Sequence, residues 1–142
     1  MSQENVELVC RALEAFNRRD LDALLALADD EVEAVPLAAG MDGSYHGHEG
    51  MRRWVENWLG AFPDWKIEVV EVRDVGEVTV TAMRLRGHGA GSDIPLDQAL
   101  WQAVRWRRGQ YVWWGNFRTE AEALEAVGLS AQDAQRSTPK PK

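Results

Sequence analysis

Residues 105–117 read RWRRGQYVWWGNF, and this stretch decides the kind of fold. Arg108 and Gly109 separate two runs rich in aromatic and β-branched residues, which predicts a hairpin of two antiparallel strands. Alternate side chains of a strand point to opposite faces of the sheet. The expected inner face carries Leu100, Gln102, Val104, Trp106, Val112, Trp114 and Asn116, and the outer face carries Trp101, Ala103, Arg105, Arg107, Tyr111, Trp113 and Phe117. The predicted sheet therefore has large rings on both faces.

A sheet that is apolar on both faces must be covered on both. Helices of the same chain can cover the inner face, but few elements remain for the outer one. A second subunit is the natural cover for an outer face that carries Trp101, Trp113 and Phe117. We therefore expect a homodimer that associates through this face.

The composition argues against nucleic acids as partners. Sixteen Lys and Arg against 23 Asp and Glu give a net charge of −7, which repels phosphate backbones. The single cysteine, Cys10, allows neither an internal disulfide nor a cysteine-based zinc site. No apolar run approaches the ~20 residues of a membrane span, and the first residues lack the pattern of a secretory leader. We expect a cytoplasmic protein with no nucleic-acid or membrane partner.

Hydrophobic spacing predicts one α+β domain over residues 1–129. Apolar residues recur with the helical period early in the chain and around Trp54 and Trp58, and with period two from residue 65 onward. The expected helices span 4–19, 21–28, 51–59 and 119–128, and the expected strands span 31–37, 65–73, 77–88, 97–107 and 110–118. Asp20 and Thr119 fit helix N-caps. Residues 130–142 lack an apolar face and are predicted to form a flexible polar tail.

Four passages carry a resemblance to a known family. They read RALEAFNRRDLDALLALADDEVEA, YHGHEGMRRWVENW, GHGAGSDIPLDQ and EAEALEAVGL, and together they span about residues 4–129, nearly all of the domain. The chain resembles the nuclear transport factor 2-like superfamily, and within it the small SnoaL-like proteins related to polyketide cyclases and ketosteroid isomerases. The resemblance implies a cone-shaped fold whose curved, mixed or antiparallel sheet wraps around three helices and encloses a pocket. Because the superfamily includes isomerases, cyclases, hydrolases, dehydratases and non-catalytic binders, it does not select a reaction.

The catalytic residues of two enzyme groups do not carry over. Ketosteroid isomerases of the superfamily use a tyrosine on the first helix, an aspartate base after the first strand and a second acid on a late strand. The matching positions here hold Ala12, Ala34 or Val35, and Gln102. None of these side chains can transfer the isomerase proton. We therefore expect no standard 3-ketosteroid isomerisation.

Epoxide hydrolases of the superfamily use an Asp, Arg, Asp cluster with an Arg-x-Asp on one strand. Here Arg84 is followed by Arg86, and the last strand offers Trp114 and Asn116. SnoaL-type cyclases rely on a pocket aspartate, which finds no match on the last two strands. Epoxide hydrolysis is therefore expected to be absent as well.

The expected ligand-binding residues are four rings and two amides. They are Trp54, Trp58, Trp106 and Trp114, with Gln102 and Asn116. Ligand sites are usually apolar with a few placed polar groups, so the amides could orient a carbonyl or hydroxyl group. The alternative is that the rings are ordinary core and that the amides bond each other or buried water.

The candidate catalytic residues are Asp42, His46, Arg84 and Asp93. Asp42 and Asp93 lie in glycine-containing loops that could border a pocket mouth, and they are otherwise solvated loop residues. An arginine on a central strand needs an anionic ligand or a carboxylate partner, which leaves an internal or intersubunit ion pair open for Arg84. The glycines of GHGAGSDIP are not followed by a helix, so a phosphate cradle is not expected.

The short segment YHGHE brings His46, His48 and Glu49 together and raises the question of a metal. The surrounding glycines indicate a loop that enters a helix, and no other ligand spacing supports a metal site. Helix capping or a surface role is the alternative, and an acid or base role for His46 is another. We expect neither a metal nor a cofactor.

Three classes of function remain open on the sequence. One is an enzyme of isomerase, cyclase or hydrolase type that acts on a small, largely apolar molecule bearing a carbonyl or hydroxyl group. The others are a non-catalytic binder of such a molecule and a dimerisation module. The first two share a small-molecule ligand, which is therefore the expected partner.

Overall fold

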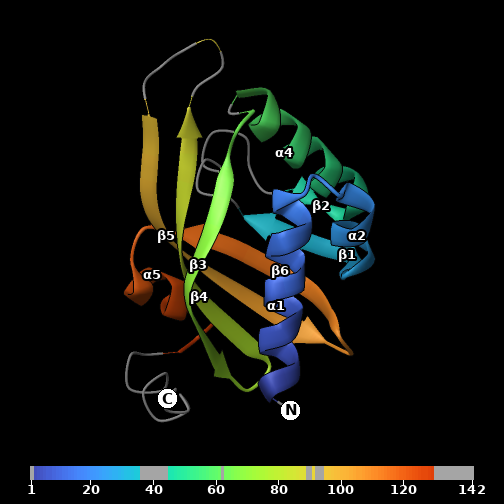
Figure 1. The fold of residues 1–142 in the computed structure, drawn as a ribbon. Coiled ribbons are helices and arrows are strands. Elements are labelled where there is room, and N and C mark those ends of the chain that lie inside the picture. Colours follow the sequence, from blue (N-terminus) through green and yellow to red (C-terminus); the bar gives the residue numbers. More distant parts are fainter. Residues whose placement is uncertain (1, 36–44, 62, 89–90, 92–94, 130–142) are drawn as a thin grey trace.

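A computed structural model describes residues 2–35, 45–61, 63–88, 91 and 95–129. The helices are α1 (Ser2–Asn17), α2 (Leu21–Ala26), α4 (Gly47–Ala61) and α5 (Glu120–Ala126), and the strands are β1 (Ala28–Val35), β2 (Tyr45–His46), β3 (Lys66–Val75), β4 (Val78–His88), β5 (Pro95–Arg107) and β6 (Gln110–Phe117). The strands form one curved, unclosed sheet in the order β2-β1-β6-β5-β4-β3 (Figure 1). Only the β1–β6 pair is parallel among the described strands. This confirms the predicted α+β fold with a mixed sheet.

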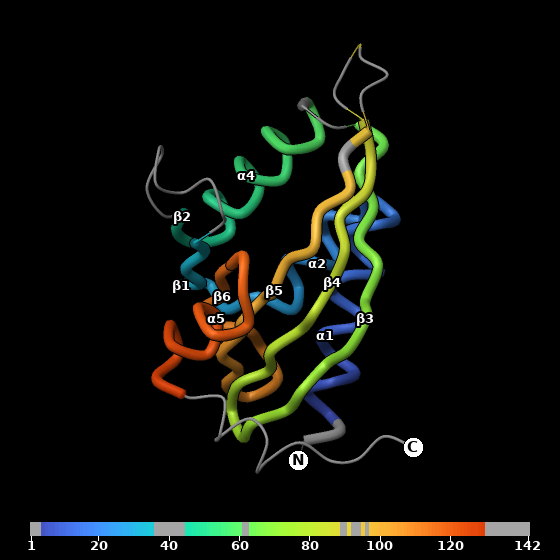
Figure 2. Tube along the Cα trace, turned by 90° about the vertical axis from the view of Figure 1, so that its left-hand side faces the viewer, coloured from blue at the N-terminus to red at the C-terminus, as the bar shows by residue number. Residues whose placement is uncertain are grey.

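The helices lie on two sides of the sheet. Helices α1, α2 and α4 line the inner face, along which β3, β4 and β5 bend (Figures 1 and 2). Helix α5 packs on the outer face against β4, β5 and β6. The inner layer holds the larger core cluster, which includes the nearly inaccessible Val9, Val32 and Ala34. None of the described helices is both long enough and apolar enough to cross a membrane.

The two predicted helix N-caps and the predicted hairpin turn are present in the structure. The Oδ1 atom of Asp20 accepts from the backbone N–H of Ala23, and the hydroxyl of Thr119 accepts from that of Glu122. Arg108 and Gly109 have φ values of 55° and 79°, which is the left-handed geometry of a two-residue hairpin turn. The boundaries of other elements differ by a few residues. In particular, α4 begins at Gly47, so the GHE of YHGHE is helical.

One irregularity changes which side chains of β6 face inward. Arg105 pairs with Trp113, but Trp106 pairs with Tyr111, so Val112 is an extra residue in β6. Such a bulge lets two residues oppose one, and it shifts the alternation of side chains by one position. Tyr111 is therefore buried on the inner face, where simple alternation predicted Val112. The prediction for these two residues was wrong.

Helix α5 covers part of the outer face. Its buried Ala123 and Leu124 pack with Val78, Val80 and Ala103, and Trp101, Trp113 and Phe117 pack around this smaller cluster. Because the chain itself supplies this cover, the burial of the three rings does not by itself require a second subunit. The homodimer therefore stays a prediction.

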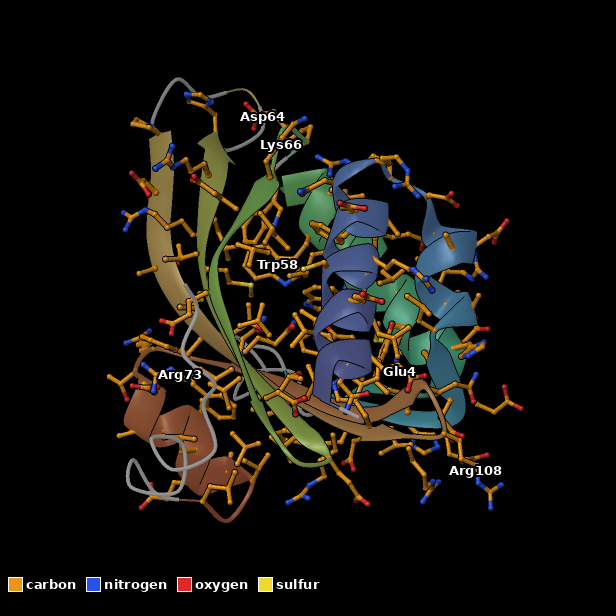
Figure 3. All side chains as sticks on the ribbon, turned by 60° about the horizontal axis from the view of Figure 1, so that its bottom comes forward. Glu4, Trp58, Asp64, Lys66, Arg73 and Arg108 are labelled. Carbon is orange, nitrogen blue, oxygen red and sulfur yellow. The ribbon has the colours of Figure 1, made fainter. Side chains whose placement is uncertain are left out.

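Two polar contacts attach α5 to the sheet. The guanidinium of Arg73 lies 3.1 Å from Oε2 of Glu120, and Figure 3 places Arg73 beside this helix. The Nη2 atom of Arg105 donates to the carbonyl of Val127 over 3.0 Å. Arg105 therefore caps the end of α5.

Candidate functional site

The curved sheet and the inner helices enclose a largely apolar main cavity. Its volume is about 590 Å³, which includes space open to solvent. The helices contribute Val9, Ala12, Leu13, Phe16, Leu24, Met51 and Trp54, and the sheet side contributes Trp65, Ile67, Met83, Leu85, Gln102, Val104, Trp106, Tyr111, Trp114 and Asn116. Such a shape and lining suit a small apolar molecule.

A second, smaller pocket adjoins the main cavity. The two share Trp54, Trp65, Leu85 and Asn116, and the second extends to Trp58, Gln98 and Leu100. The rings of Trp58 and Trp65 lie 4.8 Å apart, and Figure 3 shows Trp58 on the helix-covered side of the sheet. Five of the six residues expected to bind a ligand line the main cavity, and Trp58 lines the adjoining pocket.

The indole N–H groups of the cavity differ in how they are satisfied. Nε1 of Trp106 donates to the hydroxyl of Thr79 over 2.9 Å, and Nε1 of Trp114 contacts Sδ of Met51 at 3.0 Å. Nε1 of Trp54 is buried, and nothing in the described part of the chain bonds it. The ring of Trp54 packs against Phe16 and Trp114, with centroids 5.9 and 4.9 Å away. Trp54 thus combines a fixed ring with an available donor.

A row of three polar side chains crosses the inner face. Thr81 on β4 pairs with Gln102 on β5, which pairs with Asn116 on β6. Oγ1 of Thr81 and Oδ1 of Asn116 are buried and have no bonding partner among the described residues. An unsatisfied buried polar atom costs roughly 1–3 kcal/mol. The row is therefore a place where a polar group of a ligand would be stabilised.

Tyr111 is the only titratable side chain among the described residues that line the main cavity. Its hydroxyl donates to the carbonyl of Leu24 over 3.1 Å, and burial raises the pKa of the phenol well above its usual range. The phenol therefore stays protonated at neutral pH and is engaged with the backbone. It does not provide the base that proton abstraction needs.

Arg84 points away from the cavity. It lies on the outer face of β4, where Nε and Nη2 donate to Oδ1 of Asp97 over 3.0 and 2.8 Å. Arg86 lies 3.7 Å from the same carboxylate and 3.5 Å from Glu68. Arg84 therefore forms an ion pair within the chain, which was one of the alternatives that the sequence left open. The geometry does not support a role for Arg84 in the cavity.

His46 is not brought into the cavity either. His46 lies on β2 with 67% of its side chain exposed, and its Nε2 is 3.0 Å from Oε1 of Glu31. Nε2 of His48 is 2.9 Å from the carbonyl of Ala28. Asp42 and Asp93 lie outside the described residues. Within the described ranges, no three His, Cys, Asp or Glu side chains gather as a metal site.

Asn17, the last residue of α1, and Arg19, just beyond the helix, position the wall formed by Trp65 and Ile67. The amide of Asn17 donates to the carbonyl of Ile67 and accepts from its N–H, each over 2.8 Å. Nη2 of Arg19 donates to the carbonyls of Trp65 and Pro63 over 2.6 and 3.0 Å. The start of β3 is thereby held against the helical layer.

Sequence reasoning missed several inward residues. Tyr111 was placed on the outer face, and Trp65 was treated only as the start of a strand. Asp74 on β3 pairs with Thr79 on the inner face and is only 3% exposed. The alternation of β3 could have found Asp74, but the bulge between Val69 and Glu71 breaks the pattern.

The chain belongs to the SnoaL-like domain family, whose model matches residues 9–114. Solved structures with the same fold include an NTF2-like protein of unknown function from Burkholderia pseudomallei, at 21% identity, a TM-score of 0.74, and coverage of 88% of this chain and 98% of that chain. No curated protein matches the sequence.

Two further solved structures are described with a ligand or with a type of chemistry. A protein with a ketosteroid isomerase-like fold from Catenulispora acidiphila, in complex with trimethylamine, shows 18% identity, a TM-score of 0.73, and coverage of 89% of this chain and 95% of that chain. IdmH from Streptomyces antibioticus, a candidate polyketide cyclase, shows 19% identity, a TM-score of 0.71, and coverage of 87% and 98%. The family and these neighbours support a small-molecule-binding NTF2-like protein, and they do not select a reaction.

Proposed function

We propose that the protein binds a small, largely apolar, uncharged molecule with a carbonyl or hydroxyl group in the main cavity. The observation that carries this proposal is the lining, in which the amides of Gln102 and Asn116 interrupt apolar and aromatic side chains. No Asp, Glu, Lys, Arg or His is among the described lining residues, so a charged ligand would lose its hydration without gaining a counter-ion. A neutral ligand avoids this cost.

Binding is tested by calorimetry or thermal shift with small bicyclic compounds such as indane and its oxygenated derivatives. The variant Ala12→Phe adds a ring at a position that lines the cavity, and it should abolish binding by filling the space. Ala121 is exposed on α5, so Ala121→Phe is the matched control that should bind as the wild type does. If Ala12→Phe folds and retains full affinity, the ligand lies elsewhere and the proposal fails.

An enzyme of cyclase, isomerase or hydrolase type is the second candidate. The neighbour described as a candidate polyketide cyclase favours it. The described lining offers no available acid or base, so we assign any proton transfer to Asp42 or Asp93, ahead of His46 and Arg84. Turnover that is lost in Asp42→Asn or Asp93→Asn while ligand affinity is retained would separate an enzyme from a binder. Equal turnover in both variants would exclude these catalysts.

A further inference from the structure

Two residues that each hold a buried, unbonded hydrogen-bonding atom line both the main cavity and the smaller pocket. Trp54 and Asn116 both line both spaces. Nε1 of Trp54 can only donate, and Oδ1 of Asn116 can only accept. Both atoms are buried and unbonded by any group in the described part of the chain. A molecule lying across this junction therefore meets one donor and one acceptor.

Several other groups near the junction are already satisfied or apolar, and Trp65 and Gln98 are its further polar side chains. Trp106 and Trp114 have their N–H groups engaged by Thr79 and Met51. Leu85 and Leu100 offer no polar atoms. Trp54 and Asn116 therefore contribute one unbonded donor and one unbonded acceptor to the selectivity of the site, and Gln102 pairs with Asn116 in the cross-strand register.

A ketone and an alcohol differ in how they satisfy this pair. A carbonyl oxygen accepts from Trp54 but leaves Oδ1 of Asn116 desolvated and unpaired, which is costly. A hydroxyl group both accepts and donates, so it can serve both atoms. A hydrocarbon serves neither.

We propose that Trp54 and Asn116 together form a recognition site for a hydroxyl group, so that the cavity selects an alcohol or phenol over the corresponding ketone. This inference rests on the proposed function, because it assumes that the ligand occupies the cavity. Its apolar frame would lie among the rings of Phe16, Trp54 and Trp114, which already pack together.

The test compares three compounds with one frame: 1-indanol, 1-indanone and indane. The dissociation constants are measured by calorimetry, and the indole N–H signals are followed by ¹⁵N-correlated NMR with assigned tryptophans. We expect 1-indanol to bind most tightly, by roughly two- to tenfold for each hydrogen bond gained over indane. The Trp54 Nε1–H signal should shift on binding of the alcohol.

Variants separate the two contacts. Trp54→Phe removes the N–H and keeps a ring, and Asn116→Leu removes the amide at similar volume; each should reduce the ratio of the affinity for 1-indanol to the affinity for indane. Trp101→Phe is the matched control, because Trp101 lies on the outer face beside α5 and should change neither value. If either variant fails to fold, the wild-type affinity order and the Trp54 signal still decide the question.

The outcomes distinguish the two proposals. If none of the three compounds binds, the proposed function fails and this inference fails with it. If all bind with equal affinity, or 1-indanone binds best, or the Trp54 signal does not move, the cavity binds ligands and the hydroxyl selection is wrong. Retention of the alcohol preference in both folded variants would also refute it.

Discussion

The side-chain amide of Asn17 makes the two backbone hydrogen bonds that a neighbouring strand would make at the edge of the sheet. Its removal should lower the free energy of unfolding. Strand β3 is last in the strand order, and Asn17 makes two 2.8 Å bonds with the backbone N–H and C=O of Ile67. A net contribution of about 0.5–1.5 kcal/mol for each bond predicts that Asn17→Ala loses about 2 kcal/mol of unfolding free energy. With an m-value of about 2 kcal/mol/M, the urea midpoint should fall by about 1 M.

The assay is urea unfolding followed by tryptophan fluorescence, with the m-value checked for constancy. Asn5→Ala is the matched control, since Asn5 donates a single exposed bond of 3.4 Å to Gly76, and it should change stability by less than about 0.5 kcal/mol. Because Ile67 lines the main cavity, Asn17→Ala should also weaken ligand binding. A midpoint equal to that of Asn5→Ala would show that water replaces the amide without loss, and the reasoning would be refuted.

Three further predictions concern α5, acid stability and assembly. Leu124 is 1% exposed, so Leu124→Ala should cost about 2–5 kcal/mol in thermal or urea unfolding, and a loss below about 1 kcal/mol would mean that α5 is not a fixed cover of the sheet. The hydrogen bonds from the His88 side chain and backbone lower the pKa of Asp64, so this carboxylate stabilises the fold above its unfolded pKa of about 3.9, and the contribution is lost as the pH falls through the lower folded pKa. His88→Ala should therefore make urea midpoints less dependent on pH in this acid range, and an unchanged profile would contradict the assignment. Sedimentation at micromolar concentration should show a dimer that Trp101→Glu weakens; a wild-type monomer would rule out the dimer.

Much of the fold follows from patterns that act over a few residues. The turn at Arg108 and Gly109 and the caps by Asp20 and Thr119 depend on backbone geometry and on groups three residues away, which the sequence displays directly. Alternation also placed Gln102 and Asn116 correctly on the inner face. The candidate ligand-binding residues could therefore be identified from sequence.

Other features required the tertiary structure. The extra residue Val112 turns Tyr111 inward. The position of such a bulge depends on the neighbouring strand, so the local sequence pattern does not predict it. Alternation with the buried Met83 and Leu85 already turns Arg84 outward, but its bonding partner, Asp97, lies 13 residues away on β5 and is identified only by the tertiary structure.

The sequence by itself determined the class of fold and an apolar inner face with two amides. Only the tertiary structure decided that Nε1 of Trp54 stays unbonded while the indoles of Trp106 and Trp114 find partners. The physical reason is that periodicity sets the direction of a side chain, whereas a hydrogen bond depends on which atoms distant elements bring within about 3 Å. Those distances follow from how α4 packs against the sheet, and no residue type encodes them alone.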